Sequence, residues 1–280
     1  MILATIEPWP DLAKCLAVLA PQVNALGGEI LVGDGHGSAL TEDYVRESGC
    51  VSWIKVPGAS VFELRARAAA VARGEIIATT EDHCVVGSDW CAAILEAFAS
   101  NPEAQAVWGP ILNGSREHWI DWANYLHTFG GFLPPCDPAQ RVRCPPNANV
   151  AYRREVFPDG PIPAGWMELE LSPRLLHEGR FHLHEPLVVT HVQSHGFWHT
   201  LQAHFDNGRA TTGLNPMPLS RRQLPWNVFR AAVRVIGGGE EMRPIVRKSL
   251  PLIFVLSCCH ALGETMGILA GPGKSPARLR

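Results

Sequence analysis

The sequence of 280 residues predicts an α/β fold with a mostly parallel central sheet, followed by a helical C-terminal segment. Three observations support this fold class. Strand patterns alternate with helical patterns through the N-terminal part of the chain, as in parallel sheets with crossover helices. Ionisable side chains directly follow two of the strands, and a long apolar stretch lies near the C-terminus.

Composition narrows the class of protein. Hydrophobic residues make up 46% of the chain and the formal net charge is −3, which predicts a folded globular protein. Because there is no basic excess to bind a phosphate backbone, we expect no nucleic-acid partner. The eight cysteines form no Cys-x-x-Cys pair, which favours reduced, buried thiols. Residues 1–6 are interpreted as a strand and not as a signal peptide.

The N-terminal part supplies most of the predicted sheet. Leu12, Leu16, Leu19 and Val23 recur at helical spacing, and the glycines at 27–28 end that helix. We expect strands at 2–6, 29–32, 51–56 and 75–80, and a second helix at 62–73. Parallel strands gather ligands at their carboxyl ends. Asp34 and the residues at 81–83 are therefore expected at one edge of the sheet.

Elements are sparser further along the chain. Residues 134–146 are rich in proline and are expected to be mostly loop. The other expected elements are a strand in the sheet or at its edge (150–157), a helix (169–178), a buried strand (187–190) and a helix (194–210).

The C-terminal segment has a different character. Residues 226–236 suit an amphipathic helix, and residues 250–262 are almost wholly apolar. This apolar run is short of the roughly 20 residues that span a bilayer. An interfacial or re-entrant membrane segment is the favoured interpretation. A helix packed on the domain or on a second subunit, and a true membrane span, remain open.

Asp34 stands between Gly33 and Gly35 after the second strand. The pattern is not a dinucleotide fingerprint, because its third glycine would have to be at position 38, which is Ser38. The glycines could let a ligand approach the backbone, while the carboxylate bonds a ribose hydroxyl or a base edge. The alternative is a capped β-turn.

Glu81, Asp82 and His83 end the strand at 75–80. Three ionisable residues there suit a divalent cation that bridges phosphate oxygens, and a histidine ligand favours Mn²⁺ over Ca²⁺. A solvated loop is the alternative interpretation.

Glu168 and Glu170 begin a helix after Trp166. A carboxylate beside this indole could act as a general base, although acidic residues also favour the first turn of a helix. Being two residues apart, the two cannot face the same way.

His191, His195 and His199 have the spacing of one helical face, which raises a zinc-site hypothesis. Because a strand is expected to end near His191, we do not expect the three to share a helix. His191 alone is the candidate metal ligand. The alternative is that these are surface or core histidines.

Taken in order, these elements resemble the family 2 glycosyltransferases, which have the Rossmann-like GT-A fold. The resemblance covers about residues 1–210 and depends on the order of weak motifs. The similar stretches are Ile2 to Ile6 with Pro8, Glu29 to Gly35, Pro57-Gly58 with Arg65, Ala72 to Ile77 with Glu81-Asp82-His83, Glu168 to Leu175 through Gly179, and Val188 to His191.

The resemblance implies roles for individual residues. Donor-nucleotide contacts are implied for Thr5, Glu7, Asp34, Arg65, Glu81 and Asp82. Metal ligands are implied at Asp82, His83 and His191, with Mn²⁺ or Mg²⁺ as the cofactor. Glu168 is the implied catalytic base, and Glu170 is expected to share that role because Met167 replaces the first acid of the pair.

The implied activity is transfer of a sugar from a nucleotide diphosphate donor to a hydroxyl acceptor, with inversion. The motif Gln-x-x-Arg-Trp of processive synthases is missing, which indicates transfer of a single sugar. We expect a catalytic domain at 1–215, with a nucleotide-sugar half (1–100) and an acceptor half (101–215). The helical tail at 216–280 is similar to tails that lie on the cytoplasmic face of the membrane, where a lipid-linked acceptor would be available.

Two other classes stay open. One is a nucleotide-binding scaffold of the same fold without turnover, which the residues at 81, 83 and 167 suggest. The other is a nucleotidyltransferase, but such enzymes usually carry a Gly-rich phosphate loop with a basic residue after the first strand. This chain has Glu7-Pro8-Trp9-Pro10 there.

Overall fold

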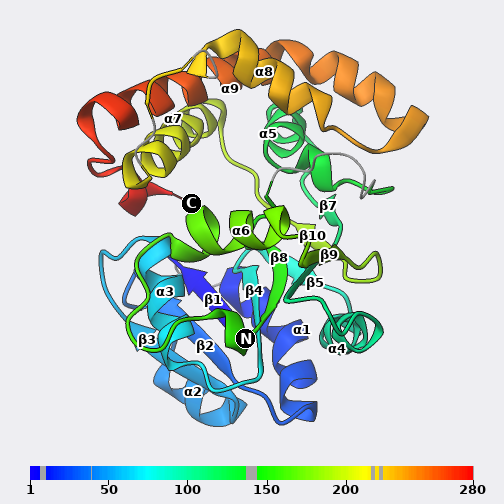
Figure 1. The fold of residues 1–280 in the computed structure, drawn as a ribbon, viewed down its shortest axis with the longest axis vertical. Coiled ribbons are helices and arrows are strands. Elements are labelled where there is room, and N and C mark those ends of the chain that lie inside the picture. The colour runs from blue at the N-terminus through cyan, green and yellow to red at the C-terminus, as the bar shows by residue number, and fades with distance from the viewer. Residues whose placement is uncertain (7–10, 39, 137–143, 216–217, 221–222, 280) are drawn as a thin grey trace. The chain divides into compact units, whose positions relative to one another are not determined.

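The computed structural model describes residues 1–6, 11–38, 40–136, 144–215, 218–220 and 223–279. The chain forms two compact units, each discontinuous in sequence (Figure 1). The α/β unit contains residues 1–110 and 144–191, and the helical unit contains residues 111–143 and 192–280. The predicted α/β fold with a mostly parallel central sheet and a helical C-terminal segment is confirmed.

The α/β unit is built on a seven-stranded sheet in the order β3-β2-β1-β4-β8-β6-β9. Its strands are β1 (Ile2–Thr5), β2 (Ile30–Asp34), β3 (Val51–Lys55), β4 (Ile76–Glu81), β6 (Ala106–Trp108), β8 (Asn149–Arg153) and β9 (Phe181–Leu183). The first four pair in parallel, and β8 runs antiparallel to both of its neighbours. The strand predicted near 150 therefore lies inside the sheet and not at its edge.

Helices and two short strands complete this unit. They are α1 (Asp11–Ala25), α2 (Glu42–Ser48), α3 (Val61–Val71), α4 (Trp90–Ser100), η2 (Arg154–Val156), the π-helix η3 (Met167–Leu171) and α6 (Ser172–His177), with β5 (Cys84–Val86) and β10 (Val189–His191). The predicted apolar face of α1 is buried, with Leu16 and Leu19 fully inaccessible. Ser60 and Glu63 form a capping box that fixes the start of α3.

Strand register places the predicted site residues at one edge. Thr5 of β1 is level with Asp34 of β2, and Ala4 is level with Glu81 of β4. All three strands run in the same direction, so their carboxyl ends meet there. We call this the carboxyl edge of the sheet.

The helical unit gathers segments from two parts of the chain. Its elements are β7 (Ile111–Asn113), α5 (Trp119–Phe129), η1 (Gly130–Phe132), α7 (Phe197–Leu214), α8 (Pro225–Arg234), α9 (Gly239–Ala270) and η5 (Ser275–Arg278). Glycines let the backbones of α7 and α9 approach closely: a Cβ at Gly208 or Gly263 would overlap a carbonyl oxygen of the other helix. Helix α7 thus belongs with α9, whereas the sequence predicted a single boundary near residue 215.

Helix α9 is longer than the apolar run that predicted it. It has 32 residues and includes Pro244 and Pro251. By length and composition alone it could cross a membrane, and 33% of its most apolar window is buried inside the protein.

Candidate active site

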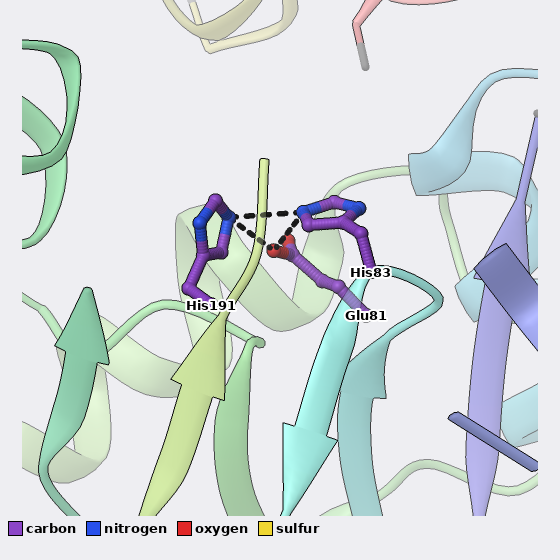
Figure 2. A group of neighbouring side chains, drawn as sticks. All are labelled: Glu81, His83 and His191. Atoms are coloured by element: carbon purple, nitrogen blue, oxygen red, sulfur yellow. Dashed lines mark hydrogen bonds and ion pairs between the residues drawn. The ribbon is translucent and has the colours of Figure 1, made fainter. Parts of the chain in front are cut away.

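Three side chains that can ligate a metal meet at the carboxyl edge. One ligand atom each from Glu81, His83 and His191 lies within 4.8 Å of the others (Figure 2). Glu81 ends β4, and His83 follows in the turn before β5. His191 ends β10 directly opposite Cys84 of β5, so antiparallel pairing carries it to His83.

The distances within this group are short. His83 Nε2 lies 2.9 Å from His191 Nε2 and 3.3 Å from a Glu81 oxygen, which is also 3.6 Å from His191 Nε2. Burial lowers the pKa of His83, but hydrogen bonds to Asp82 and Glu81 outweigh it and raise that pKa to about 10. Burial also lowers the pKa of His191. Burial raises the pKa of Glu81, yet the two imidazoles hold it well below its usual range.

Asp82 lies behind His83. One of its oxygens is 2.8 Å from His83 Nδ1, and the other accepts a hydrogen bond from the Thr5 hydroxyl at 2.6 Å. A carboxylate on the distal nitrogen of a ligating histidine fixes the orientation of the ring and makes it more basic. The predicted ligands His83 and His191 thus meet in the metal-capable group, whereas Asp82 positions His83 and Glu81 takes the place expected of Asp82.

The turn after β4 sets the directions of these side chains. Glu81 ends the strand, and Asp82 and His83 form the turn before β5. Asp82 is directed back toward Thr5 in β1, while His83 meets Glu81 and His191. The donor set of one carboxylate and two imidazoles fits Mn²⁺, Fe²⁺ or Zn²⁺ better than the all-oxygen preference of Mg²⁺ or Ca²⁺.

Arg65 links the metal-capable group to the predicted base. Its guanidinium, buried on α3, donates to Glu81 at 3.0 Å and to Glu168 at 3.2 Å. Burial lowers the pKa of Arg65, but the two carboxylates outweigh it and raise that pKa. Arg65 thus stays charged. It holds together two carboxylates, those of Glu81 and Glu168, which are 87 positions apart in the chain.

Glu168 is held by a chain of hydrogen bonds that the sequence did not predict. The Asn147 amide donates to Glu168 Oε1 at 2.7 Å, and its own oxygen accepts from the Tyr152 hydroxyl at 2.9 Å. Tyr152 is fully buried, and burial raises its pKa, so it stays a neutral hydroxyl. Asn147 and Tyr152 carry no spacing signal, since only the folded sheet brings Asn147 to Glu168 and Tyr152 to Asn147. Glu170, in the same π-helix, is exposed.

Asp34 reaches the carboxyl edge but is used within the protein. Its carboxylate is inaccessible and accepts hydrogen bonds from the backbone N–H of His36 and Gly37, both at 2.8 Å, and from the Trp53 indole at 2.9 Å. A Cβ at Gly33 would lie 2.9 Å from Leu64 Cβ, so that glycine admits helix α3. This geometry favours the capped turn over direct contact with a ligand.

The remaining predicted residues lie elsewhere. Glu7 falls outside the described residues. His195 and His199 belong to the helical unit, with ring centroids 4.3 Å apart, and His191 belongs to the α/β unit. The helical unit also holds a cavity of about 390 Å³ lined by His199, Gln202, Ala203, Asp206, Ala277 and Arg278. Of these residues, only His199 was considered in the zinc-site hypothesis.

No family model matches the sequence, and no curated protein matches it. The chain is similar to solved glycosyltransferase structures at low identity. TarS of S. aureus, residues 1–349, is 13% identical with a TM-score of 0.46, over 95% of this chain and 89% of that one. Against a longer TarS structure the chain covers only 54% of that protein, at 15% identity.

A third structure is glucosyl-3-phosphoglycerate synthase from Mycobacterium tuberculosis, in complex with Mn²⁺ and UDP-glucose. It is 15% identical with a TM-score of 0.46, over 70% of this chain and 71% of that one.

Proposed function

We propose that the chain is an inverting glycosyltransferase that moves one sugar from a nucleotide diphosphate donor to a hydroxyl acceptor. One observation carries the proposal: the metal-capable group Glu81, His83 and His191 and the carboxylate of Glu168 meet at the carboxyl edge, joined by Arg65. The resemblance to family 2 glycosyltransferases supports the same assignment. We also propose a location at the cytoplasmic face of a membrane.

The metal-capable group would bind the donor side of the reaction. A divalent ion held there would neutralise the charge on the leaving diphosphate. The Thr5 hydroxyl donates to Asp82 at 2.6 Å, and Asp82 in turn holds His83 Nδ1 at 2.8 Å. This chain keeps His83 Nε2 directed at Glu81 and His191. Because two of the three ligands are imidazoles, we propose Mn²⁺ as the ion in preference to Mg²⁺.

Glu168 would act as the general base on the acceptor side. Arg65 and Asn147 both bind its Oε1, which leaves Oε2 to take the proton of the acceptor hydroxyl. The acceptor oxygen then bonds to the anomeric carbon while the bond from that carbon to the diphosphate oxygen breaks. Attack opposite the leaving group inverts the anomeric centre, as in inverting glycoside hydrolysis.

The two glutamates of the π-helix give a matched test. Turnover of UDP- and GDP-sugars is measured with Mn²⁺ for Glu168→Gln and for Glu170→Gln, an exposed neighbour of identical chemistry. We expect kcat to fall about 10²–10⁴-fold for Glu168→Gln and to change less than about threefold for Glu170→Gln. Full turnover by Glu168→Gln would remove Glu168 as the base.

Binding without turnover is the second candidate. Glu81 and His83 stand where the family pattern has two aspartates, and Met167 replaces the first acid of the base pair. These departures are the observation that favours a scaffold. Saturable binding of nucleoside diphosphate with no release of sugar from any donor would support the scaffold over the enzyme.

A further inference from the structure

The helical unit carries most of the protein's positive charge. It holds 14 Lys and Arg against 7 Asp and Glu, a formal +7, while the α/β unit has 10 against 20, a formal −10. The net charge of −3 conceals this division. A basic unit attached to an acidic one indicates a negatively charged partner for the basic unit.

Exposed apolar side chains gather in the same unit. Of 16 large hydrophobic residues exposed in the described chain, 12 belong to the helical unit, although it is the smaller of the two. Single exposed hydrophobic residues are normal, but a concentration on one unit marks an interaction surface.

Five of these side chains form one face of α9. With 100° per residue, Phe254, Val255, Leu262, Met266 and Leu269 fall within an arc of about 120° around the helix. All five are exposed, between 38% and 69%. The exposed residues Arg247 and Lys248 fall on the same arc one turn before the apolar run.

Helix α8 extends this face. Trp226 and Phe229 pack edge-on against Phe254, with ring centroids 6.4 and 5.5 Å from it, and Trp226 is 56% exposed. Arg230 and Arg234 of α8 are exposed as well. We define the α8–α9 face as Trp226, Phe229, Phe254, Val255, Leu262, Met266 and Leu269.

The opposite side of α9 is unsuited to lipid. Ser257 is buried there and bonds His127 of α5 at 3.2 Å, while His260 lies 3.7 Å from Glu264. The close contact of Gly263 with α7 fills the rest of that side. Polar groups backed by protein cannot face hydrocarbon without large cost, so only one side of α9 can enter a bilayer.

We propose that the helical unit binds the surface of an anionic lipid bilayer through the α8–α9 face. Helix α9 lies in the plane of the interface, with its apolar arc among the acyl chains and Arg230, Arg234, Arg247 and Lys248 at the headgroups. A second copy of the chain is a poorer occupant. A symmetric contact would bring the same basic residues of two copies together. The proposal does not depend on transferase activity.

The test is co-sedimentation of the full chain with vesicles of phosphatidylcholine alone and with 30% phosphatidylglycerol. We expect binding to the anionic vesicles that weakens between 0.1 and 0.5 M salt, because the Debye length falls from about 10 Å to about 4 Å. Arg230→Gln with Arg234→Gln should lower the partition coefficient about 25-fold, since each basic residue contributes roughly fivefold. The matched control is Lys14→Gln with Arg46→Gln, two exposed basic residues of the α/β unit, which should change it less than about twofold.

The apolar arc has its own pair of variants. Phe254→Ser with Leu262→Ser should weaken binding at least about tenfold, while Leu26→Ser with Leu95→Ser, equally exposed on the α/β unit, should not. Thermal melting confirms that each variant folds, and unchanged nucleoside diphosphate binding separates this proposal from the proposed function. Absence of binding to anionic vesicles, or a dimer that Phe254→Ser with Leu262→Ser dissociates, would overturn the proposal. Retention in the membrane after carbonate extraction would overturn the in-plane orientation of α9.

Discussion

Replacement of Arg65 by Met tests the geometry on which the candidate site depends. Arg65 is buried and is the cation that lies between Glu81 and Glu168, at 3.0 and 3.2 Å. Removing it leaves two carboxylates, with side chains 21% and 17% exposed, facing one another across an apolar methionine. Breaking a buried pair costs about 3–5 kcal/mol. Because His83 still neutralises Glu81 and both carboxylates retain some water, we expect the lower end, about 3 kcal/mol.

The assay is urea unfolding followed by circular dichroism. Arg67→Met is the matched control, because Arg67 lies two residues further along the same helix and is exposed. It should change the free energy of unfolding by less than about 0.5 kcal/mol.

A double-mutant cycle identifies the partner. Glu168→Gln should cost less in the Arg65→Met background than in the wild type, with a coupling energy of at least about 1 kcal/mol. A loss below about 1 kcal/mol for Arg65→Met, or no coupling, would refute the bridged arrangement.

Three further predictions concern other parts of the molecule. Tyr152→Phe removes the hydroxyl that donates to Asn147, so thermal melting should show a loss of stability of about 1–2 kcal/mol. The variant should also lower kcat with little change in KM. A wild-type kcat would show that Asn147 needs no support from Tyr152. Burial raises the pKa of Cys15 to about 12, so near pH 8 its thiolate is about a thousandfold rarer than that of a thiol with an ordinary pKa. Mass spectrometry after iodoacetamide treatment should therefore find Cys15 protected in the native protein and modified in urea. Equal rates of Cys15 modification in the native protein and in urea would contradict its burial. Gly263→Ala places a methyl group against a carbonyl oxygen of α7, so thermal melting should show a loss of stability of about 1–3 kcal/mol. In the control Gly196→Ala the added methyl group meets nothing within 4 Å, and the loss should be less than about 1 kcal/mol. Equal losses of stability in the two variants would contradict the close packing of α7 on α9.

Local patterns predicted the parallel half of the sheet. The spacing of Leu12, Leu16 and Leu19 located α1 and its buried face, because an amphipathic helix needs only its own residues to show its period. The alternation of strands and helices placed Asp34 and Glu81 at one edge, which the register of β1 with β2 and β4 bears out.

Features that depend on distant contacts escaped prediction. Strand β8 inserts between β4 and β6, and nothing in its own sequence selects those partners. Asn147, just before β8, and Tyr152, within it, become relevant only because the folded sheet brings the Asn147 amide to Glu168 and the Tyr152 hydroxyl to Asn147. The assignment of α7 to the helical unit depends on glycine contacts with α9, and no pattern within α7 reveals them.

The proposed function requires a divalent metal bound at the carboxyl edge by Glu81, His83 and His191. Isothermal titration of the full chain with Mn²⁺, with and without UDP, measures this binding. We expect one Mn²⁺ per chain, tighter UDP binding when Mn²⁺ is present, and loss of both effects in His191→Ala. His177→Ala, an exposed histidine of the same unit, should behave as the wild type. Equal Mn²⁺ binding by His191→Ala and the wild type, or no binding by the wild type, would contradict the claim.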